Sequence, residues 1–499
     1  MANFCSNLIL YRKVLYMAII AGVGGTFLFG FQVSVINFTS PYIKAFINDT
    51  WVERYNAPVD EERLMLLWSF IVSIFSIGGL IGSWSSGYLS AKYGKKNCLI
   101  FNSLLMMAAA VTVGTSEIAK TFEIILLARL LYGLSAGLGC CIQAQYLAEI
   151  SPKHLRGFIN VSLAVFATLG KFLGQVAGQN ELLGTESLWP LLLAINGVLG
   201  LGILVTTPFF PESPPYLLTQ KRDLKGCLKA LKQLWGEGDH QAEVDDMLKE
   251  QASMKEAKIM NVWELLREKS MRCQLYLLIA IGISLSLSGI SAVYFYASDV
   301  FSTAGFDEGL ISYVTIGIGA CELCATIFCF ILIEHFGRRK LLLWGYGVMI
   351  LILALLTAAL SLQDRAFWIP YCSTGLIFLF ILAYGMGPAG ATFPVIIELF
   401  TVSSRPAALV ISMSLHWMGI YLLGMLFPYA ALHLGTFCFL VFMGFIVISW
   451  NIIFWFLPET KGKSIVEIQG EFSKSKRGKK KEAAMINHLY EDDTVCTKL

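Results

Sequence analysis

The chain has 499 residues, of which 56% are hydrophobic and 15% charged, and its mean hydropathy is +0.65. A soluble globular protein carries about 25% charged residues, so this composition cannot cover a water-facing surface. The formal net charge of +3 gives no reason to expect a nucleic-acid partner. The composition therefore predicts a protein embedded in the lipid bilayer.

Apolar residues come in blocks of about twenty, each long enough to cross the ~30 Å hydrocarbon layer as a helix. The first block, Val14–Ile36, is longer than the apolar core of a signal peptide and lacks a small-residue cleavage pattern. The fold class expected is all-α. Twelve transmembrane helices are predicted at 14–37, 66–90, 97–116, 123–145, 157–179, 188–208, 273–297, 310–334, 341–361, 368–393, 407–430 and 434–457.

The loops between these spans alternate in charge. Loops after odd-numbered spans carry little positive charge when they are short, chiefly Lys120 and Arg365. Because basic loops stay in the cytosol, the loops after even-numbered spans and both termini are expected there. The membrane expected is the plasma membrane. The basic loops contain Lys92, Lys95, Lys96, Lys153, Arg156, Arg338, Arg339, Lys340 and Arg405.

Two stretches break the apolar pattern. Residues 209–272 turn polar and contain helical runs at Leu224–Trp235 and Val244–Lys258, which predicts a cytosolic helical insert. Residues 458–499 form a polar tail with a basic run. The expected organisation is a cytosolic N-terminus at 1–13, a six-helix half at 14–208, the insert at 209–272, a second six-helix half at 273–457, and a cytosolic tail at 458–499.

The two predicted halves repeat one another. Motifs recur at nearly one offset, of 243 (337 − 94), 249 (398 − 149) and 247 (458 − 211) residues. Six spans in each half make the repeats parallel, which places a solute site near the membrane midplane between them. The matched motifs are the basic turns around Gly94 and Gly337, the pairs Glu149/Arg156 and Glu398/Arg405, and the sequences Pro211-Glu212-Ser213 and Pro458-Glu459-Thr460.

Charged residues gather where the spans meet the cytosol. Partly buried pairs of opposite charge bias a two-state equilibrium by a few kcal/mol. One interpretation is a latch, in which ion pairs join the halves when the cytosolic side closes and break when it opens. The alternative is that these charges only anchor the helices. The candidate gating residues are Glu149, Arg156, Glu334, Arg338, Arg339, Glu398 and Arg405.

Several of these motifs resemble the signatures of the facilitative sugar transporters of the major facilitator superfamily. They are the basic turns, the Glu-x6-Arg pairs, Pro211-Glu212-Ser213-Pro214 and Pro458-Glu459-Thr460-Lys461-Gly462. The resemblance runs from about Leu10 to Phe472. It implies the major facilitator fold and the facilitative transport of a hexose such as glucose or fructose by alternating access. Ala297-Ser298, Gly319-Ala320-Cys321-Glu322-Leu323 and His416-Trp417 resemble the fructose-and-urate branch of that family.

The resemblance also implies residues that contact the solute. His416 and Trp417 take positions that contact substrate in the fructose branch, the alternative being an interfacial aromatic pair. Thr168 stands where relatives have a sugar-contacting glutamine, and Glu322 where they have an asparagine. Because an ionisable group in mid-membrane is costly, Glu322 is a functional candidate by itself, with helix packing as the alternative. Gln32 in the first span is a further candidate.

One face of the fifth span is polar. Thr168, Lys171 and Gln175 lie within about 60° of one another around a helix, so they form one stripe. Since Thr168 is expected to face the cavity, Gln175 is expected there too. The Lys171 ammonium either faces the cavity as well or extends to the membrane surface.

The seventh span departs from the family pattern. Relatives have two glutamines and an asparagine where this chain has Leu285, Ser286 and Ser291, and the tenth span has Ala391 in place of a tryptophan. A serine offers a single hydroxyl and a leucine offers nothing, so the wall is expected to be roomier and to bind sugar more weakly. A flatter purine-like or urate-like solute is therefore an alternative cargo, and a solute sensor that does not transport is another. Ser286 and Ser291 remain candidate contacts.

The first span also indicates which energy source drives transport. Proton-coupled relatives have an aspartate where this chain has Gln32, and an amide cannot titrate, which predicts passive uniport. Glu322 leaves proton linkage as the alternative.

The sequence contains no Walker loop, nucleophile elbow or H-E-x-x-H motif, so neither an enzyme nor a cofactor is expected. Cys321 and Cys324 have no second pair and are interpreted as packing residues rather than metal ligands.

One motif in the sequence predicts a covalent modification, and another predicts a protein partner. Asn48-Asp49-Thr50 is an N-glycosylation sequon in the predicted first outer loop. The last residues, Thr497-Lys498-Leu499, fit a ligand for a PDZ-type domain that binds a terminal carboxylate. The partners expected are a small-molecule solute, the lipid bilayer and this PDZ-type contact.

Overall fold

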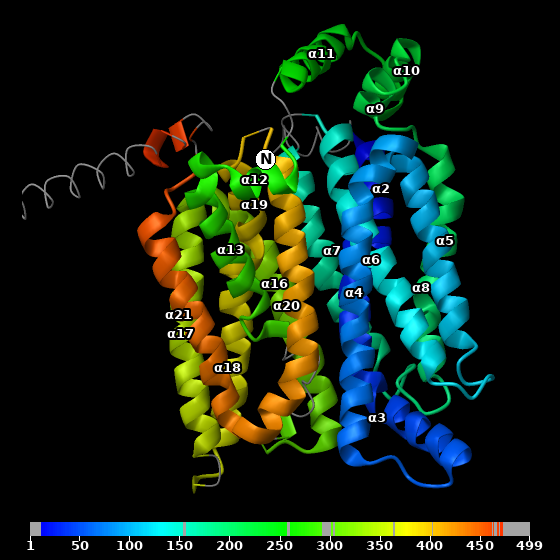
Figure 1. Ribbon diagram of the computed structural model, residues 1–499, viewed down its shortest axis with the longest axis vertical. Helices are drawn as coiled ribbons and strands as arrows, with labels where there is room; N and C mark the ends of the chain where they lie inside the picture. The colour runs from blue at the N-terminus through cyan, green and yellow to red at the C-terminus, as the bar shows by residue number, and fades with distance from the viewer. Residues whose placement is uncertain are drawn as a thin grey trace, which may run out of the picture.

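The computed structural model describes most of the chain between Tyr11 and Phe472, and every regular element in that part is a helix (Figure 1). The expected all-α class is confirmed. The predicted Ala297-Ser298 motif, the basic run of the tail and the terminal Thr497-Lys498-Leu499 lie outside the described residues, as do the side chains of Arg156 and Glu334. The described residues are 11–152, 156–256, 260–291, 301–302, 305–362, 365–401, 403–461, 463, 467–468 and 470–472.

The first helical stretch is longer than the sequence predicted. It runs without a break through α2 (Arg12–Gly22), a π-helical turn η1 (Val23–Phe27) and α3 (Leu28–Tyr55). The predicted span ended at residue 37, but the helix continues because Ile43 and Ile47 bury one face of its last turns. Asn48 consequently lies on a helix rather than in the expected outer loop.

The rest of the first half packs through small residues. A Cβ atom on Gly133 of α6 would lie 1.9 Å from the Phe75 carbonyl oxygen of α4, so only glycine allows this helix contact. After α8 a short turn, η2 (Thr207–Phe209), leads to the insert. The helices are α4 (Glu61–Tyr93), α5 (Lys95–Gly114), α6 (Glu123–Ile150), α7 (Arg156–Ala177) and α8 (Trp189–Thr206).

The insert is a set of short helices that contacts both halves. It contains α9 (Pro214–Thr219), α10 (Leu224–Trp235), α11 (Gln241–Glu256) and α12 (Val262–Arg267). The Asp223 carboxylate accepts a hydrogen bond from Gly226 N and caps α10. At the other end of α10, Trp235 Nε1 donates to Ile150 O of α6 at 2.8 Å. The capped and anchored α10 coincides with the helical run that the sequence predicted.

The second half is also built from helices. Its tenth-span segment bends through a π-helical turn that contains Pro388, because proline removes a backbone donor from the helix. The elements are α13 (Arg272–Ser286), α16 (Glu308–Phe336), α17 (Arg338–Ser361), α18 (Ile369–Tyr384), η5 (Gly385–Ala389), α19 (Gly390–Leu399), α20 (Arg405–Leu434) and α21 (Cys438–Phe456).

Many of these helices are suited to a bilayer. Within the described ranges, nine helical stretches are long and apolar enough to cross a membrane, and one of them, Arg405–Phe456, contains both α20 and α21. A shorter apolar segment, Ser162–Ala177, belongs to α7. The expected multi-pass membrane architecture is confirmed.

The two halves stand side by side in Figure 1, with the blue-to-cyan helices in one bundle and the green-to-orange helices in the other. They meet where α4 packs against α20 and where α7 packs against α16. Helices α9, α10 and α11 lie at the end of the molecule where α2 begins (Figure 1). This end is called the insert end below, and the opposite end the far end.

The internal repeat is visible as two matching helix caps. Glu212 Oε1 accepts hydrogen bonds from Lys95 N and Lys96 N, both at 3.0 Å, at the start of α5. Glu459 Oε1 accepts from Arg338 N at 3.0 Å at the start of α17. A carboxylate at a helix N-terminus satisfies free backbone donors and the helix dipole together. The proline-glutamate motifs that the sequence matched therefore perform the same structural task in both halves.

Candidate solute site

The predicted gating charges form ion pairs inside each half. Lys95 Nζ lies 3.0 Å from Glu149 Oε1, and Arg338 Nε lies 3.2 Å from Glu398 Oε1. The first pair joins α5 to α6, and the second joins α17 to α19. A latch between the halves and simple anchoring were the two interpretations of these charges, and the two pairs described here tie neighbouring helices of one half. The reason is that each carboxylate ends a helix beside the basic start of another helix in its own half.

Arg339 and Arg405 hold helix ends in the second half. Arg339 Nη2 donates to Phe454 O in the last turn of α21 at 2.7 Å, and Arg405 Nη2 donates to Phe400 O just after α19 at 3.5 Å. Cations at helix C-termini satisfy free carbonyls and the negative end of the dipole. These contacts stabilise the insert end of the second half.

A buried ion pair crosses from one half to the other. Lys171 Nζ of α7 lies 2.7 Å from Glu322 Oε1 of α16, and the two side chains are 11% and 2% exposed. Removing two charges from water is costly, so the pair persists only because the partners are in direct contact. Lys171 therefore faces the interface between the halves and does not extend to the membrane surface. The charge of Glu322, which the sequence placed in mid-membrane, is neutralised by this lysine.

Further polar groups with free hydrogen-bonding capacity surround this pair. Gln175 is 1% exposed and lies about one helical turn from Lys171, and both of its amide atoms lack hydrogen-bond partners in the described structure. His416 Nδ1 of α20 is also buried and unpartnered there. An unsatisfied buried polar group costs about 1–3 kcal/mol, a cost that a bound polar solute would remove.

An aromatic wall adjoins His416. The Phe29 ring lies 5.8 Å from the His416 ring and 5.5 Å from the Trp417 ring, centroid to centroid, and Phe75 lies 5.8 Å from Trp417. Trp417 is 2% exposed, and its Nε1 donates to Ser83 Oγ of α4 at 2.8 Å. The indole reaches across the interface because α4 has Gly79 there, where a Cβ would lie 2.4 Å from the ring. The predicted pair His416 and Trp417 is thus placed between the halves.

Two residues that the sequence predicted to contact the solute form hydrogen bonds with other residues of the first half. Gln32 is fully buried, its Nε2 donates to Leu193 O at 3.3 Å, and its Oε1 accepts from Arg129 Nη1 at 3.1 Å. The Thr168 hydroxyl donates to Ala164 O, one turn back in its own helix, at 3.1 Å. The Gln32 side chain was expected to contact the solute, but in the structure its amide oxygen accepts a hydrogen bond from Arg129.

The seventh-span serines occupy a tight contact. Ser286 is 1% exposed, its hydroxyl has no hydrogen-bond partner among the described atoms, and a Cβ on Gly419 of α20 would lie 2.2 Å from the Ser286 Cβ. The helices α13 and α20 are in close contact at Ser286. The roomier cavity expected from the loss of glutamine therefore does not extend to this position. Ser291 is half-buried at the end of the described part of this span.

Arg129 is a buried charge that the sequence analysis did not single out. It is 1% exposed, its Nη1 also donates to Gln32 O at 3.1 Å, and its guanidinium lies 4.6 Å from the centre of the Phe75 ring. Its position within the apolar block 123–145 was the available signal, since the argument that marked Glu322 applies equally to it. Through Phe75, Arg129 supports the aromatic wall from behind.

The glycosylation sequon has a helical setting. Asn48 Oδ1 accepts a hydrogen bond from Val59 N at 3.2 Å, and the Thr50 hydroxyl donates to Phe46 O at 2.7 Å. Both side chains of the sequon are therefore engaged in the folded protein.

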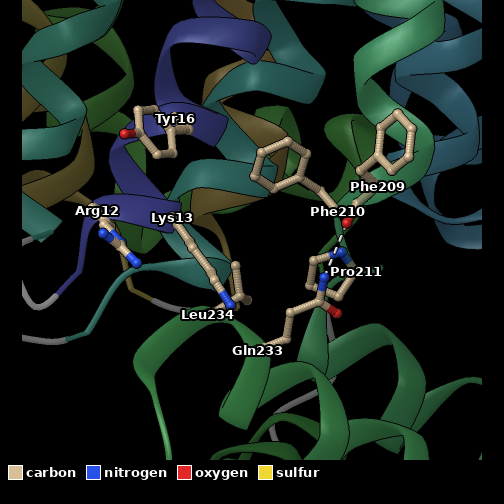
Figure 2. A pocket seen from close by; sticks show the side chains of 8 residues that line it. All are labelled: Arg12, Lys13, Tyr16, Phe209, Phe210, Pro211, Gln233 and Leu234. Atoms are coloured by element: carbon tan, nitrogen blue, oxygen red, sulfur yellow. Dashed lines mark hydrogen bonds between the residues drawn. The ribbon is translucent and has the colours of Figure 1, made fainter.

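A separate groove of about 290 Å³ lies at the insert end (Figure 2). Its lining comes from α2, the segment 209–211 and α10, and Gln233 Nε2 donates to Phe209 O across it at 2.9 Å (Figure 2). All of these residues belong to the first half and the insert, so the groove is not part of the interface between the halves. The described residues contain no cluster of three or more His, Cys, Asp or Glu side chains suited to a metal ion.

The chain is similar to known transporters over nearly its whole length. The family profile described as "Sugar (and other) transporter" matches residues 17–472. The chain is 41% identical to solute carrier family 2, facilitated glucose transporter member 11, of Homo sapiens, over 93% of this chain and 94% of that one. It is 38% identical to member 9 of Mus musculus (95% and 88% covered) and to member 5 of Equus caballus (91% and 91%). The expected resemblance to the facilitative sugar transporters and their fructose-and-urate branch is thus confirmed.

The fold has solved counterparts. The inward-open xylose transporter XylE from E. coli superposes with a TM-score of 0.75 at 21% identity, covering 92% of this chain and 99% of that one. The same major facilitator protein, described as a proton:xylose symporter and bound to 6-bromo-6-deoxy-D-glucose, gives 0.73 at 21% identity, covering 92% and 98%. The fold is accordingly that of the major facilitator superfamily. The family profile and the relatives above 30% identity show that the chain belongs to the sugar (and other) transporter family.

Proposed function

We propose that this protein is a facilitative carrier of a hexose, such as glucose or fructose, which moves by alternating access between its two halves. The observation that carries the proposal is the placement of His416, Trp417, Gln175 and the Lys171–Glu322 pair where α7 meets α16 and α4 meets α20. Names of relatives such as facilitated glucose transporter members 11 and 5 support the hexose.

Specific groups would serve specific parts of a sugar. The free amide of Gln175 and the free Nδ1 of His416 offer hydrogen bonds to hydroxyl groups. The rings of Phe29 and Trp417 offer apolar surface to the C–H face of the sugar ring. Glu322 would accept a hydrogen bond with its carboxylate, and Ser286 and Ser291 would contribute hydroxyls from the seventh span.

The proposed arrangement in the membrane has twelve spans, with the insert and both termini in the cytosol of a plasma membrane. The nine apolar helical stretches of the described residues support it, as does the gathering of Lys95, Lys96, Arg338 and Arg339 at the insert end. In this arrangement the far end is the outer side. The candidate gating residues would then act at the cytosolic gate, and a glycan would attach at Asn48. These gating residues are Glu149, Arg156, Glu334, Arg338, Arg339, Glu398 and Arg405.

We propose passive transport from two positions that bear on proton coupling, Gln32 and Glu322. Gln32 cannot release a proton, and the Glu322 carboxylate is balanced by Lys171 at 2.7 Å. With both positions occupied in this way, the solute gradient is the only driving force that we propose. A flatter purine-like or urate-like solute is the second candidate, favoured by the stacking surface of Phe29, Phe75 and Trp417.

The test is uptake by purified protein in liposomes, with labelled glucose, fructose and urate compared side by side. The matched variants are Trp417→Ala, at 2% exposure in the proposed site, and Trp455→Ala, at 74% exposure on the surface. We expect saturable hexose entry that Trp417→Ala lowers at least about tenfold and Trp455→Ala leaves unchanged. Entry of urate without hexose would select the second candidate. Solute binding without entry would indicate a sensor and contradict transport.

A further inference from the structure

We propose that the Lys171–Glu322 ion pair is the lock of the outer gate, and that Lys171 is a positioning residue of the transport cycle. When the pair forms, the outer side is shut, and when the site opens outward the pair must separate. This inference rests on the proposed alternating access and specifies one contact by which it is controlled.

The position of the pair carries the argument. Helices α7 and α16 run in opposite directions, and contacts between α16 and the segment that follows α7 extend from the pair toward the far end. Gln179 Nε2 donates to Ser312 O at 3.2 Å, and beyond it Tyr313 Oη donates to Glu181 Oε1 at 2.8 Å. Lys171 and Glu322 are the innermost members of this row. Opening the far side by moving the halves apart would therefore break the row, with the ion pair as its last contact.

The chemistry of the pair makes it a lock rather than a general packing contact. The other two hydrogen bonds of the row involve an exposed carboxylate and a backbone carbonyl, which water can replace. The Lys171 and Glu322 side chains are 11% and 2% exposed, so each depends on the other while the gate is closed. Once the gate opens, water reaches both groups and solvates them separately. Loss of one partner thus destabilises the closed state and leaves the open state almost unaffected.

Close contact between the helices keeps the lock in reach. A Cβ on Gly319 of α16 would lie 1.9 Å from Gln175 Oε1 and 3.1 Å from Phe172 Cα of α7, so a larger residue would displace the Gln175 side chain and press on the α7 backbone one turn from the pair. Gly319→Ala is therefore expected to weaken the lock without altering either charge.

The experiment measures how readily the outer side opens. A cysteine is introduced as Ser312→Cys, and its labelling by a membrane-impermeant maleimide added outside is followed by mass spectrometry at that position. In this background the test variants are Lys171→Met, Glu322→Gln, Gly319→Ala and the swap Lys171→Glu with Glu322→Lys. The control is Lys120→Met, which removes the exposed pair of Lys120 with Glu53, 67% and 56% exposed and also 2.7 Å apart.

We expect each of the first three variants to be labelled at least about tenfold faster, with the swap near the parent rate and Lys120→Met unchanged. If the swap does not fold, Glu322→Asp replaces it and should fall between the parent and Glu322→Gln. Parent-like labelling of Lys171→Met and Glu322→Gln would overturn the proposal, as would Glu322→Asp labelling as fast as Glu322→Gln. Because labelling needs no hexose, failure of hexose uptake with pair-dependent labelling would reject the cargo and retain the lock.

Discussion

The repeated helix cap gives the most quantitative prediction. Gly94 joins α4 to α5 with φ +89° and ψ 160°, a conformation that side chains with a Cβ avoid. A Cβ there would also lie 2.3 Å from Glu212 Oε2. Gly94→Ala should therefore strain the backbone and displace the carboxylate that caps α5.

The magnitude follows from the bonds involved. Glu212→Ala removes two charge-assisted hydrogen bonds at the start of α5, worth about 1.5–3 kcal/mol each before water replaces part of them. We expect a net cost of about 2–4 kcal/mol. Gly94→Ala should cost about 1–3 kcal/mol in strain and about 2 kcal/mol in lost capping. When Glu212 is already absent only the strain remains, so the double variant should be about 2 kcal/mol more stable than the sum of the single changes predicts.

The assay is a double-mutant cycle on the Tm of the protein in detergent, with Gly337→Ala and Glu459→Ala as the equivalent cycle in the second half. There, Gly337 has φ +85° and a Cβ would lie 2.8 Å from the Glu459 carboxylate. The mixed cycle of Gly94→Ala with Glu459→Ala is the control and should be additive, since these residues belong to different halves. Additive losses in the Gly94–Glu212 cycle would refute the capping argument.

Other changes test the site and the insert. His416→Ala should lower hexose uptake about tenfold by removing a ring that contacts Phe29, and uptake kinetics would show it as a raised KM. Leu285→Gln with Ser291→Asn should raise hexose affinity about tenfold by restoring two hydrogen-bonding amides, and unchanged competition by unlabelled glucose would count against this. Burial raises the pKa of the Cys227 thiol to about 11, so it should stay protonated and unalkylated at pH 8, whereas prompt labelling would show that the insert is loosely packed.

The helices of this protein were largely predictable from sequence because each apolar block is long enough to satisfy its backbone only as a helix. The internal repeat was also predictable from the sequence, because the same proline-glutamate motif occurs in each half, and its glutamate, Glu212 or Glu459, caps a helix there. The end of the first helix was not, because the buried face of α3 beyond residue 37 depends on tertiary packing of Ile43 and Ile47. Local apolar content does not reveal such packing.

The candidate site was predictable in composition but not in pairing. The sequence placed the charge of Glu322 inside the membrane and put Lys171 and Gln175 on one helical face, and in the structure all three side chains are buried. No pattern in the sequence states that Lys171 meets Glu322 across 151 residues, because that contact depends on how the two halves dock. For the same reason Gln32 was assigned to the solute, whereas tertiary structure assigns its amide to Arg129.

The most direct test of facilitative transport is the steady-state distribution of labelled hexose in liposomes that contain the purified protein and an imposed proton gradient. We expect protein-dependent entry until the internal concentration of hexose equals the external one, with the same end point when a protonophore is added. Accumulation above the external concentration that collapses with the protonophore would contradict it and would identify Glu322 as the group to examine for proton exchange.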